Sequence, residues 1–180
     1  IAGQACLHAC MAGMRMATPL LALREGYSPL AVGVLLALFA LTQVFLSLPA
    51  GRYADRHGLR RPVALAVMAA AGAAGLAAAF PVFPVLCLAA LANGGATGAA
   101  SIALQRHVGR IVSGPVQLRQ AFSWLAIGPA FSNFIGPFSA GLLIDHAGFR
   151  TAFFALSLLA LGTWACVRKS RELPPPEVPA

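Results

Sequence analysis

Six runs of apolar residues dominate this chain, and each is long enough to cross a lipid bilayer as a helix. A membrane-spanning helix needs ~20 consecutive, mostly apolar residues. The chain is 59% hydrophobic and only 10% charged, whereas soluble domains carry ~25% charged residues. This excess excludes an ordinary soluble fold and predicts an all-α integral membrane protein. The predicted spans are residues 1–23, 30–48, 62–80, 85–105, 120–144 and 151–167.

The most polar segment, Ala50–Pro62, lies between the second and third runs. We interpret it as a loop at the membrane surface, because irregular backbone is unstable in hydrocarbon, and we place Asp55 near the start of the next helix.

Cations are distributed unevenly between the two sides of the predicted membrane. Cytoplasmic loops are enriched in Lys and Arg, and ten cations fall on the side of segment 50–62 against two on the other side. The sequence therefore predicts a plasma (inner) membrane protein whose N-terminus and tail after the last span are cytoplasmic. The ten are Arg52, Arg56, Arg60, Arg61, Arg106, Arg110, Arg119, Arg168, Lys169 and Arg171, and the two are Arg24 and Arg150.

One pattern of residues occurs twice in the chain. Ala-Gly-x-x-x-Asp-x-x-Gly-x-Arg begins at Ala50 and again, ninety positions later, at Ala140. Each copy joins the second and third spans of a three-span unit, and because three is odd the second unit must be inverted in the membrane. Inverted repeats are typical of secondary transporters. We therefore predict two inverted three-helix repeats.

The first copy extends to G-x-x-x-D-R-x-G-x-R-R, formed by Gly51, Asp55, Arg56, Gly58, Arg60 and Arg61. It resembles the signature loop between the second and third helices of the major facilitator superfamily of secondary transporters. Leu59 departs from the usual pattern, which has Arg or Lys after the second glycine. The resemblance implies the N-terminal six-helix half of a twelve-span fold, with residues 168–180 beginning the central cytoplasmic loop.

That resemblance also implies a mechanism and a set of partners. The expected mechanism is alternating access driven by an ion or substrate gradient, with the signature loop clamping against the other half in one state. The expected partners are the lipid bilayer, a small-molecule substrate and the C-terminal six-helix half of the same protein.

A second element lies in the fifth run, where Gly136-Pro137-x-x-Ala140-Gly141 resembles the G-P-x-x-G-G element of proton-coupled drug exporters in the superfamily. Ala140 departs from that element, and the arginine that such exporters tend to carry in the fourth span is absent from residues 85–105. The resemblance implies efflux of drugs or metabolites. Because proline removes a helix hydrogen bond, we predict bends of the fifth helix around Gly136, Pro137 and Gly141.

Glycines in the third and fourth runs predict close packing of helices. Small residues let helix backbones approach one another inside a membrane. Gly72 and Gly75 lie in an alanine-rich run, and Gly94 and Gly98 form a G-x-x-x-G pair. We expect all four to face neighbouring helices.

Polar side chains inside the spans are the candidates for substrate binding or ion coupling. They are Gln4, His8, Arg15, Gln43, Asn93, Thr97 and Asn133. A mid-span arginine costs ~2.5–3.5 kcal/mol to insert, and no acidic residue lies within a span to pair with Arg15. Three candidates remain for the partner of its guanidinium: an anionic substrate, a carboxylate of a second half, and backbone carbonyl groups alone. For the uncharged residues, hydrogen bonding between helices is an equally good explanation.

The sequence offers no support for several other classes of protein. The spacings of Cys6, Cys10, Cys87 and Cys166 fit no zinc or redox motif. No catalytic or nucleotide-binding motif occurs, so we predict neither an enzyme nor a cofactor or metal. The net charge of +8 is spread over short segments between spans, so nucleic acid is not an expected partner.

We expect both ends to be cuts in a longer protein. The alternative to a transporter is a non-transporting half that only packs or assembles with partners.

Overall fold

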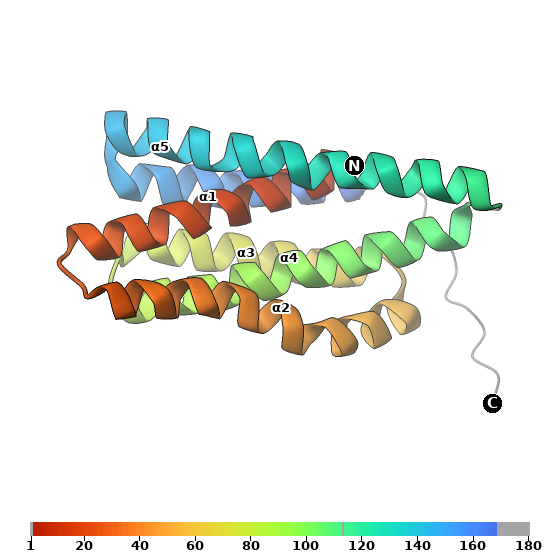
Figure 1. The fold of residues 1–180 in the computed structure, drawn as a ribbon, viewed down its shortest axis with the longest axis horizontal. Helices are drawn as coiled ribbons and strands as arrows, with labels where there is room; N and C mark the ends of the chain where they lie inside the picture. Colours follow the sequence, from red (N-terminus) through yellow and green to blue (C-terminus); the bar gives the residue numbers. More distant parts are fainter. Residues whose placement is uncertain (1, 113, 169–180) are drawn as a thin grey trace.

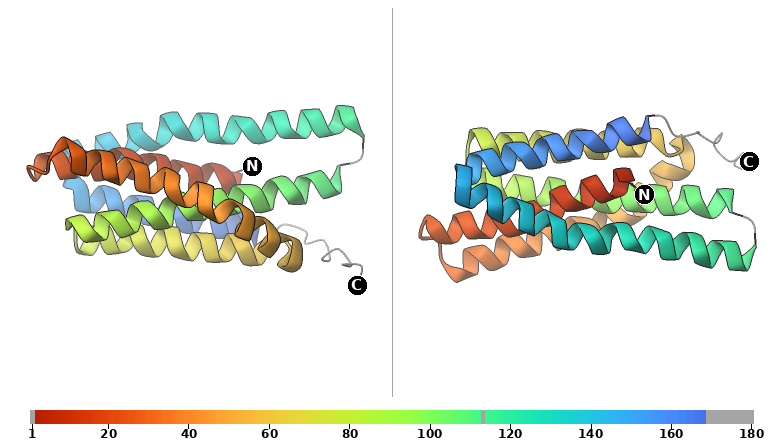
Figure 2. Two further views of the ribbon diagram at one scale, coloured as in Figure 1. Left: turned by 60° about the horizontal axis from the view of Figure 1, so that its bottom comes forward. Right: turned by 90° about the horizontal axis from the view of Figure 1, so that it is seen from above.

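The computed structural model describes residues 2–112 and 114–168. Within these residues the regular structure is α-helical and contains no strand, which confirms the predicted all-α class. The helices are α1 (Ala2–Arg24), α2 (Pro29–His57), α3 (Arg60–Ala79), α4 (Phe83–Ile111) and α5 (Pro115–Val167). All five are long and apolar enough to cross a membrane, and they form one elongated bundle (Figure 1, Figure 2).

The predicted fifth and sixth spans both lie in α5, which consists of two helices joined at Gly148. Gly148 is the one residue of α5 with non-helical dihedral angles, at φ 82° and ψ 171°. Figure 1 shows the chain reverse direction there, so that α5 has a first arm (115–147) and a second arm (149–167). Glycine adopts a positive φ at little cost, and one such residue reverses the chain without a loop.

The predicted loop over Ala50–Pro62 is wrong, because most of this segment is helical. α2 continues through Pro49, and only Gly58 and Leu59 separate it from α3. α4 likewise continues beyond the predicted span 85–105 and ends at Ile111. Hydropathy marks where a helix leaves the lipid, whereas the hydrogen-bond ladder of the helix continues into the aqueous interface. A proline removes one bond from that ladder, and here it does not end the helix.

Backbones approach closely at glycines of α4 and α5. A Cβ atom added to Gly94 would lie 2.2 Å from the Phe39 carbonyl oxygen of α2, and one added to Gly136 would lie 2.5 Å from the Ala9 carbonyl oxygen of α1. The packing role predicted for Gly94 is therefore confirmed. The same prediction is wrong for Gly72, because a Cβ atom there would meet no neighbouring atom within 4 Å.

The glycines and proline of the exporter-like element keep helical dihedral angles inside the first arm of α5. Bends at Gly136, Pro137 and Gly141 therefore stay a prediction. The structure assigns Gly136 another role, since its missing side chain lets α1 and the first arm touch. The element thus acts in helix packing, which a proline-based argument does not anticipate.

Cationic residues gather at one end of the bundle, which we call the basic end. It holds the α2–α3 turn, the end of α4, the start of α5 and the end of the second arm (Figure 1). The described cations of these segments are Arg52, Arg56, Arg60, Arg61, Arg106, Arg110, Arg119 and Arg168. Arg24 and Arg150 lie at the opposite end. Beyond Arg168, the predicted tail lies outside the described residues.

Aromatic contacts join the helices at the opposite end. The Arg24 guanidinium lies over the Phe149 ring, 5.6 Å from its centre, and this joins α1 to the second arm of α5. The rings of Tyr27 and Phe83 stack with their centres 4.8 Å apart. Ser28 caps α2, because its hydroxyl oxygen accepts a hydrogen bond of 3.3 Å from a backbone N–H of the first turn.

The outer surface of the bundle is apolar. α2 is the most hydrophobic of the candidate spans and is also mostly exposed. Val44, Phe45 and Leu48 are 70%, 72% and 73% exposed. Exposed apolar area on this scale is unfavourable in water and is favourable against lipid. The helices and their surface together describe a multi-pass membrane protein.

Candidate functional site

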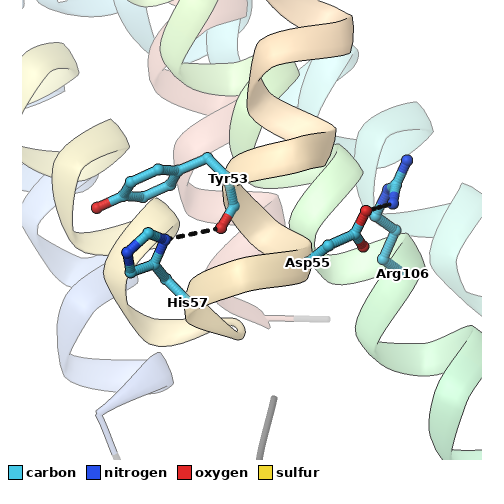
Figure 3. A network of polar contacts seen from close by, with 4 residues as sticks. All are labelled: Tyr53, Asp55, His57 and Arg106. Carbon is cyan, nitrogen blue, oxygen red and sulfur yellow. Dashed lines mark hydrogen bonds and ion pairs between the residues drawn. The ribbon is translucent and has the colours of Figure 1, made fainter. Parts of the chain in front are cut away.

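Two signature residues of α2 hold one arginine of α4. Gly51 and Asp55 lie one helical turn apart, so both face the same neighbour. The Asp55 carboxylate accepts a hydrogen bond from the Arg106 guanidinium and forms an ion pair with it (Figure 3). A Cβ atom at Gly51 would lie 2.8 Å from Nη2 of Arg106. The glycine therefore leaves room for the guanidinium, and the aspartate one turn later binds it.

The position of Asp55 differs from the prediction. It lies in the last turns of α2 and not near the start of α3, because α2 extends beyond the apolar run. Carboxylates are disfavoured at helix C-termini, so Arg106 and not a helix N-terminus supplies the favourable charge. The side chains of Arg106 and Asp55 are 47% and 45% exposed, and ion pairs this exposed contribute up to ~1 kcal/mol. The pair fixes geometry more than it stabilises the fold.

Tyr53 and His57 form a second contact on the other side of the same helix (Figure 3). Their rings stack with centres 4.2 Å apart, and Nδ1 of His57 lies 3.2 Å from the Tyr53 carbonyl oxygen. Both contacts lie within the last two turns of α2.

The two copies of the sequence repeat share one backbone feature. Gly58, which ends α2, has φ 73° and ψ −156°, and Gly148, ninety positions later, has φ 82° and ψ 171°. Both lie where the chain reverses between neighbouring helical segments. Leu59 follows the first of these glycines and is 4% exposed, which explains why an apolar residue occupies a position that is basic in the family pattern.

The remaining signature residues, Arg56, Arg60 and Arg61, lie around this turn. Arg56 and Arg61 are exposed, and Arg60 is half-buried at the start of α3. The charges of Arg56 and Arg61 therefore face outward at the basic end.

Three of the predicted site residues converge on one face, which we call the Arg15 face. Arg15 of α1 lines two surface hollows. One, of about 160 Å³, lies against α2 and is also lined by Gln43, and the other, of about 380 Å³, lies against the first arm of α5 and is also lined by Asn133. All three side chains are exposed, and among the described residues no ion pair involves Arg15.

Asn93 and Thr97 lie apart from the Arg15 face, inside the bundle. Both are fully buried. Asn93 accepts a hydrogen bond of 3.4 Å from the Cys10 thiol of α1 and donates one of 3.0 Å to the Ala89 carbonyl oxygen. Thr97 donates one of 2.8 Å to the Asn93 carbonyl oxygen. In this conformation Asn93 joins α1 to α4, whereas the hydrogen bond of Thr97 lies within α4.

Gln4 and His8 also lie apart from Arg15, although all three are on α1. They line a partly open pocket of about 200 Å³ between α1, α3, α4 and the second arm of α5. The polar residues of α1 are therefore divided between this pocket and the Arg15 face.

Arg106 is the residue of this site that the sequence-based reasoning missed. The positive-inside count includes it only as one cation among ten, because 51 positions separate it from Asp55. The signal that points to it is positional, since Arg106 and Asp55 leave the membrane at the same predicted side. Among the described residues no group of three or more His, Cys, Asp or Glu side chains is placed to hold a metal ion.

The comparison with protein families identifies the family of this chain. The model of the Major Facilitator Superfamily matches residues 2–180. In the comparison with curated proteins nothing matches this chain. The family match covers almost the whole chain, including the signature residues of α2 and the Arg15 face. The chain therefore belongs to the major facilitator superfamily, a family of secondary transporters.

Proposed function

We propose that this chain forms the N-terminal half of a transporter that moves small molecules by alternating access, driven by an ion or substrate gradient. The observation that carries the proposal is the Arg15 face. A cation in the middle of a membrane helix is costly, and this one lines two hollows without an ion pair among the described residues. Such a residue is explained by a partner outside this half. Transport of a panel of small molecules by the full chain tests the proposal.

In this proposal the Arg15 face lies against the C-terminal six-helix half and borders the substrate site. The face draws side chains from α1, α2 and the first arm of α5. Because Arg15 is permanently charged, the substrate is anionic, or a carboxylate of the other half holds Arg15 until the substrate replaces it. The flanking amides Gln43 and Asn133 supply donors and acceptors that orient a bound molecule. The exporter-like element beginning at Gly136 favours efflux as the direction.

We further propose that the half consists of six spans in two inverted repeats, with the arms of α5 as the fifth and sixth spans and residues 168–180 as the start of the central loop. The matching backbone at Gly58 and Gly148 supports the repeat. The packing of α1 on the first arm of α5 corresponds to that of α4 on α2, as an inverted repeat requires. Glycines mark both contacts.

The pair between Asp55 and Arg106 is proposed to hold the signature segment in the conformation that clamps against the other half. We expect Asp55→Asn to lower the transport rate by up to about fivefold. Loss of an ion pair that contributes ~1 kcal/mol to one conformation changes the equilibrium between the two conformations by that factor. Expression and thermal stability are expected to stay unchanged, since the pair is half-exposed. The measurement is initial transport rate per folded protein.

Two variants control this experiment. Asp145→Asn removes the equivalent carboxylate of the second repeat, at the opposite end, and is expected to transport normally. The exchange Asp55→Arg with Arg106→Asp restores the pair and places a cation at the end of α2, where the helix dipole favours it. A normal rate in Asp55→Asn, or no recovery in the exchanged protein, argues against the role of the pair.

The basic end is proposed to face the cytoplasm. In a cysteine-free background, Arg150→Cys is expected to react with a membrane-impermeant thiol reagent on intact cells. Arg56→Cys is expected to react only after permeabilisation. Both positions are exposed, so the difference reports sidedness, and the reverse pattern would overturn the topology.

A further inference from the structure

An open apolar groove runs along the outer surface of the bundle between α2 and α3, and α4 forms its floor. Its volume is about 430 Å³, and it shares no lining residue with the two hollows of the Arg15 face or with the pocket between α1 and α4. Leu46 of α2 and Leu65 of α3 are exposed at its two rims, whereas Gly95 and Ala96 of α4 are buried between them. The groove is therefore open to whatever surrounds the bundle.

The lining of the groove favours an acyl chain over water. Among the described residues that line it, only Tyr53 has a polar side-chain atom, and a bound water needs two to four polar partners. In a membrane the exposed apolar rims lie in lipid, so an acyl chain fills the groove and makes the van der Waals contacts that an empty groove would lose. The acyl chains of different phospholipids are equally apolar. A preference for one phospholipid must therefore come from its headgroup.

Two arginines lie where the groove reaches the basic end. The groove ends at Tyr53 on α2 and at Pro62 on α3. Arg56 follows Tyr53 by three positions, and Arg61 precedes Leu65 by four. Residues with these spacings lie on the same side of a helix, so both cations stand on the groove side, within one turn of its end. Both are exposed, and neither forms an ion pair or hydrogen bond with another described residue.

The surroundings of this end of the groove suit the negatively charged headgroup of a lipid. Asp55 is the described carboxylate nearest to the two arginines in sequence, but it lies on the opposite side of α2 from Tyr53 and pairs with Arg106 (Figure 3). Tyrosine is typical of the depth at which lipid headgroups begin, and Tyr53 marks the end of the apolar lining. A headgroup above an acyl chain in the groove therefore meets two cations and, among the described residues, no unpaired carboxylate.

We propose that this groove and its two arginines bind an anionic phospholipid. The acyl chain lies between α2 and α3, and the phosphate lies between the guanidinium groups of Arg56 and Arg61. Guanidinium groups bind phosphate through paired, charge-assisted hydrogen bonds, and basic pockets between membrane helices recognise anionic headgroups. A zwitterionic phospholipid binds more weakly, because the same arginines repel its ammonium group. The bound lipid links α2 to α3 beside the signature residues.

Quenching of a tryptophan by brominated acyl chains measures which lipid fills the groove. Leu65→Trp places the reporter at the rim, as the single tryptophan of the full chain. The protein is reconstituted into vesicles that contain phosphatidylcholine and phosphatidylglycerol in both leaflets. Bromine is carried by one lipid or by the other at equal mole fraction, and the two quenching values give the local ratio of the lipids. If Leu65→Trp does not fold, Leu46→Trp at the opposite rim takes its place.

Trp164 is the matched reporter outside the groove. It is an exposed native residue of the second arm of α5 and does not line the groove. Leu65 lies four positions from Arg61, and Trp164 lies four positions from Arg168, so both reporters are close to a cation of the basic end. As the single tryptophan, Trp164 measures the general attraction of this end for anionic lipid.

The ratio of phosphatidylglycerol to phosphatidylcholine at Leu65→Trp is expected to exceed that of the vesicle by roughly fivefold for each arginine, the factor that one basic residue near a membrane surface contributes. A smaller excess is expected at Trp164. Arg56→Gln combined with Arg61→Gln is expected to abolish the excess at Leu65→Trp.

The charge control combines Arg119→Gln with Arg168→Gln. This variant removes the same number of exposed cations from the basic end, both of them on or at the end of α5 and outside the groove lining. It is expected to leave the lipid preference at Leu65→Trp unchanged.

Four results would overturn the proposal. Equal quenching by the two lipids at Leu65→Trp means that the groove accepts any acyl chain. An equal preference at Trp164 means that the attraction belongs to the basic end as a whole. A preference that survives the loss of Arg56 and Arg61 means that these arginines do not hold the headgroup. Quenching by neither lipid means that protein covers the groove. None of these readouts depends on transport or on which end faces the cytoplasm, so this site and the proposed function are tested separately.

Discussion

Replacing Arg15 by alanine is expected to lower transport by roughly tenfold or more in the full protein while leaving its folding intact. Hydrogen bonds to a charged group contribute ~1.5–3 kcal/mol, and Arg15 is the one cation that lines the hollows of the Arg15 face among the described residues. Folding is preserved because removal of the guanidinium relieves α1 of the ~2.5–3.5 kcal/mol that a mid-span arginine costs.

The measurement is initial transport rate across a panel of anionic and neutral substrates, normalised to folded protein. Arg15→Lys keeps the charge but not the fork of donors, so partial activity is expected. Arg150→Ala removes an exposed arginine at the opposite end and should transport normally. If Arg15→Ala transports every substrate at the parent rate, Arg15 has a structural role and the proposed substrate face is wrong.

Replacing Gly94 by alanine is expected to destabilise the bundle by ~3 kcal/mol or more, at the upper end of the cost of overpacking. The new Cβ atom would lie 2.2 Å from the Phe39 carbonyl oxygen and 2.8 Å from Oγ1 of Thr42. A carbonyl oxygen belongs to the backbone and cannot swing aside, so α2 and α4 must separate. Since α2 carries Asp55 and Gln43, this separation also disturbs both parts of the proposed transport machinery.

Gly72→Ala provides the matched control for that experiment. Gly72 is also in the middle of a helix, but a Cβ atom added there would meet no neighbouring atom within 4 Å. Alanine is favoured over glycine in a helix by ~0.5–1 kcal/mol. Thermal unfolding in detergent is expected to show a loss of roughly 5–10 °C for Gly94→Ala and no loss for Gly72→Ala. Equal melting temperatures for the two variants would show that α2 and α4 are not in close contact at Gly94.

Much of the fold follows from residue order alone. Apolar runs of spanning length require helices, because a backbone in lipid must satisfy its own hydrogen bonds. The repeat identifies Gly58 and Gly148 as equivalent, and both reverse the chain with a positive φ. The distribution of arginines identifies one end of the bundle as basic, since charges accumulate where helices leave the membrane. These features depend on solvent preference and on local backbone freedom, and both are properties of short stretches of sequence.

The partners of individual side chains depend on tertiary structure. The spacing of Gly51 and Asp55 places them on one face of α2. The contact of Arg106 with this face depends on how α4 packs against α2. Similarly, Arg15, His8 and Asn93 are all polar residues of predicted spans, yet the structure places them on the Arg15 face, in a separate pocket and in the packed core. The sequence by itself determined which segments enter the lipid and where the chain turns. Only the tertiary structure decided which polar groups meet, because that depends on the rotation and depth of each helix, and neighbouring helices set both.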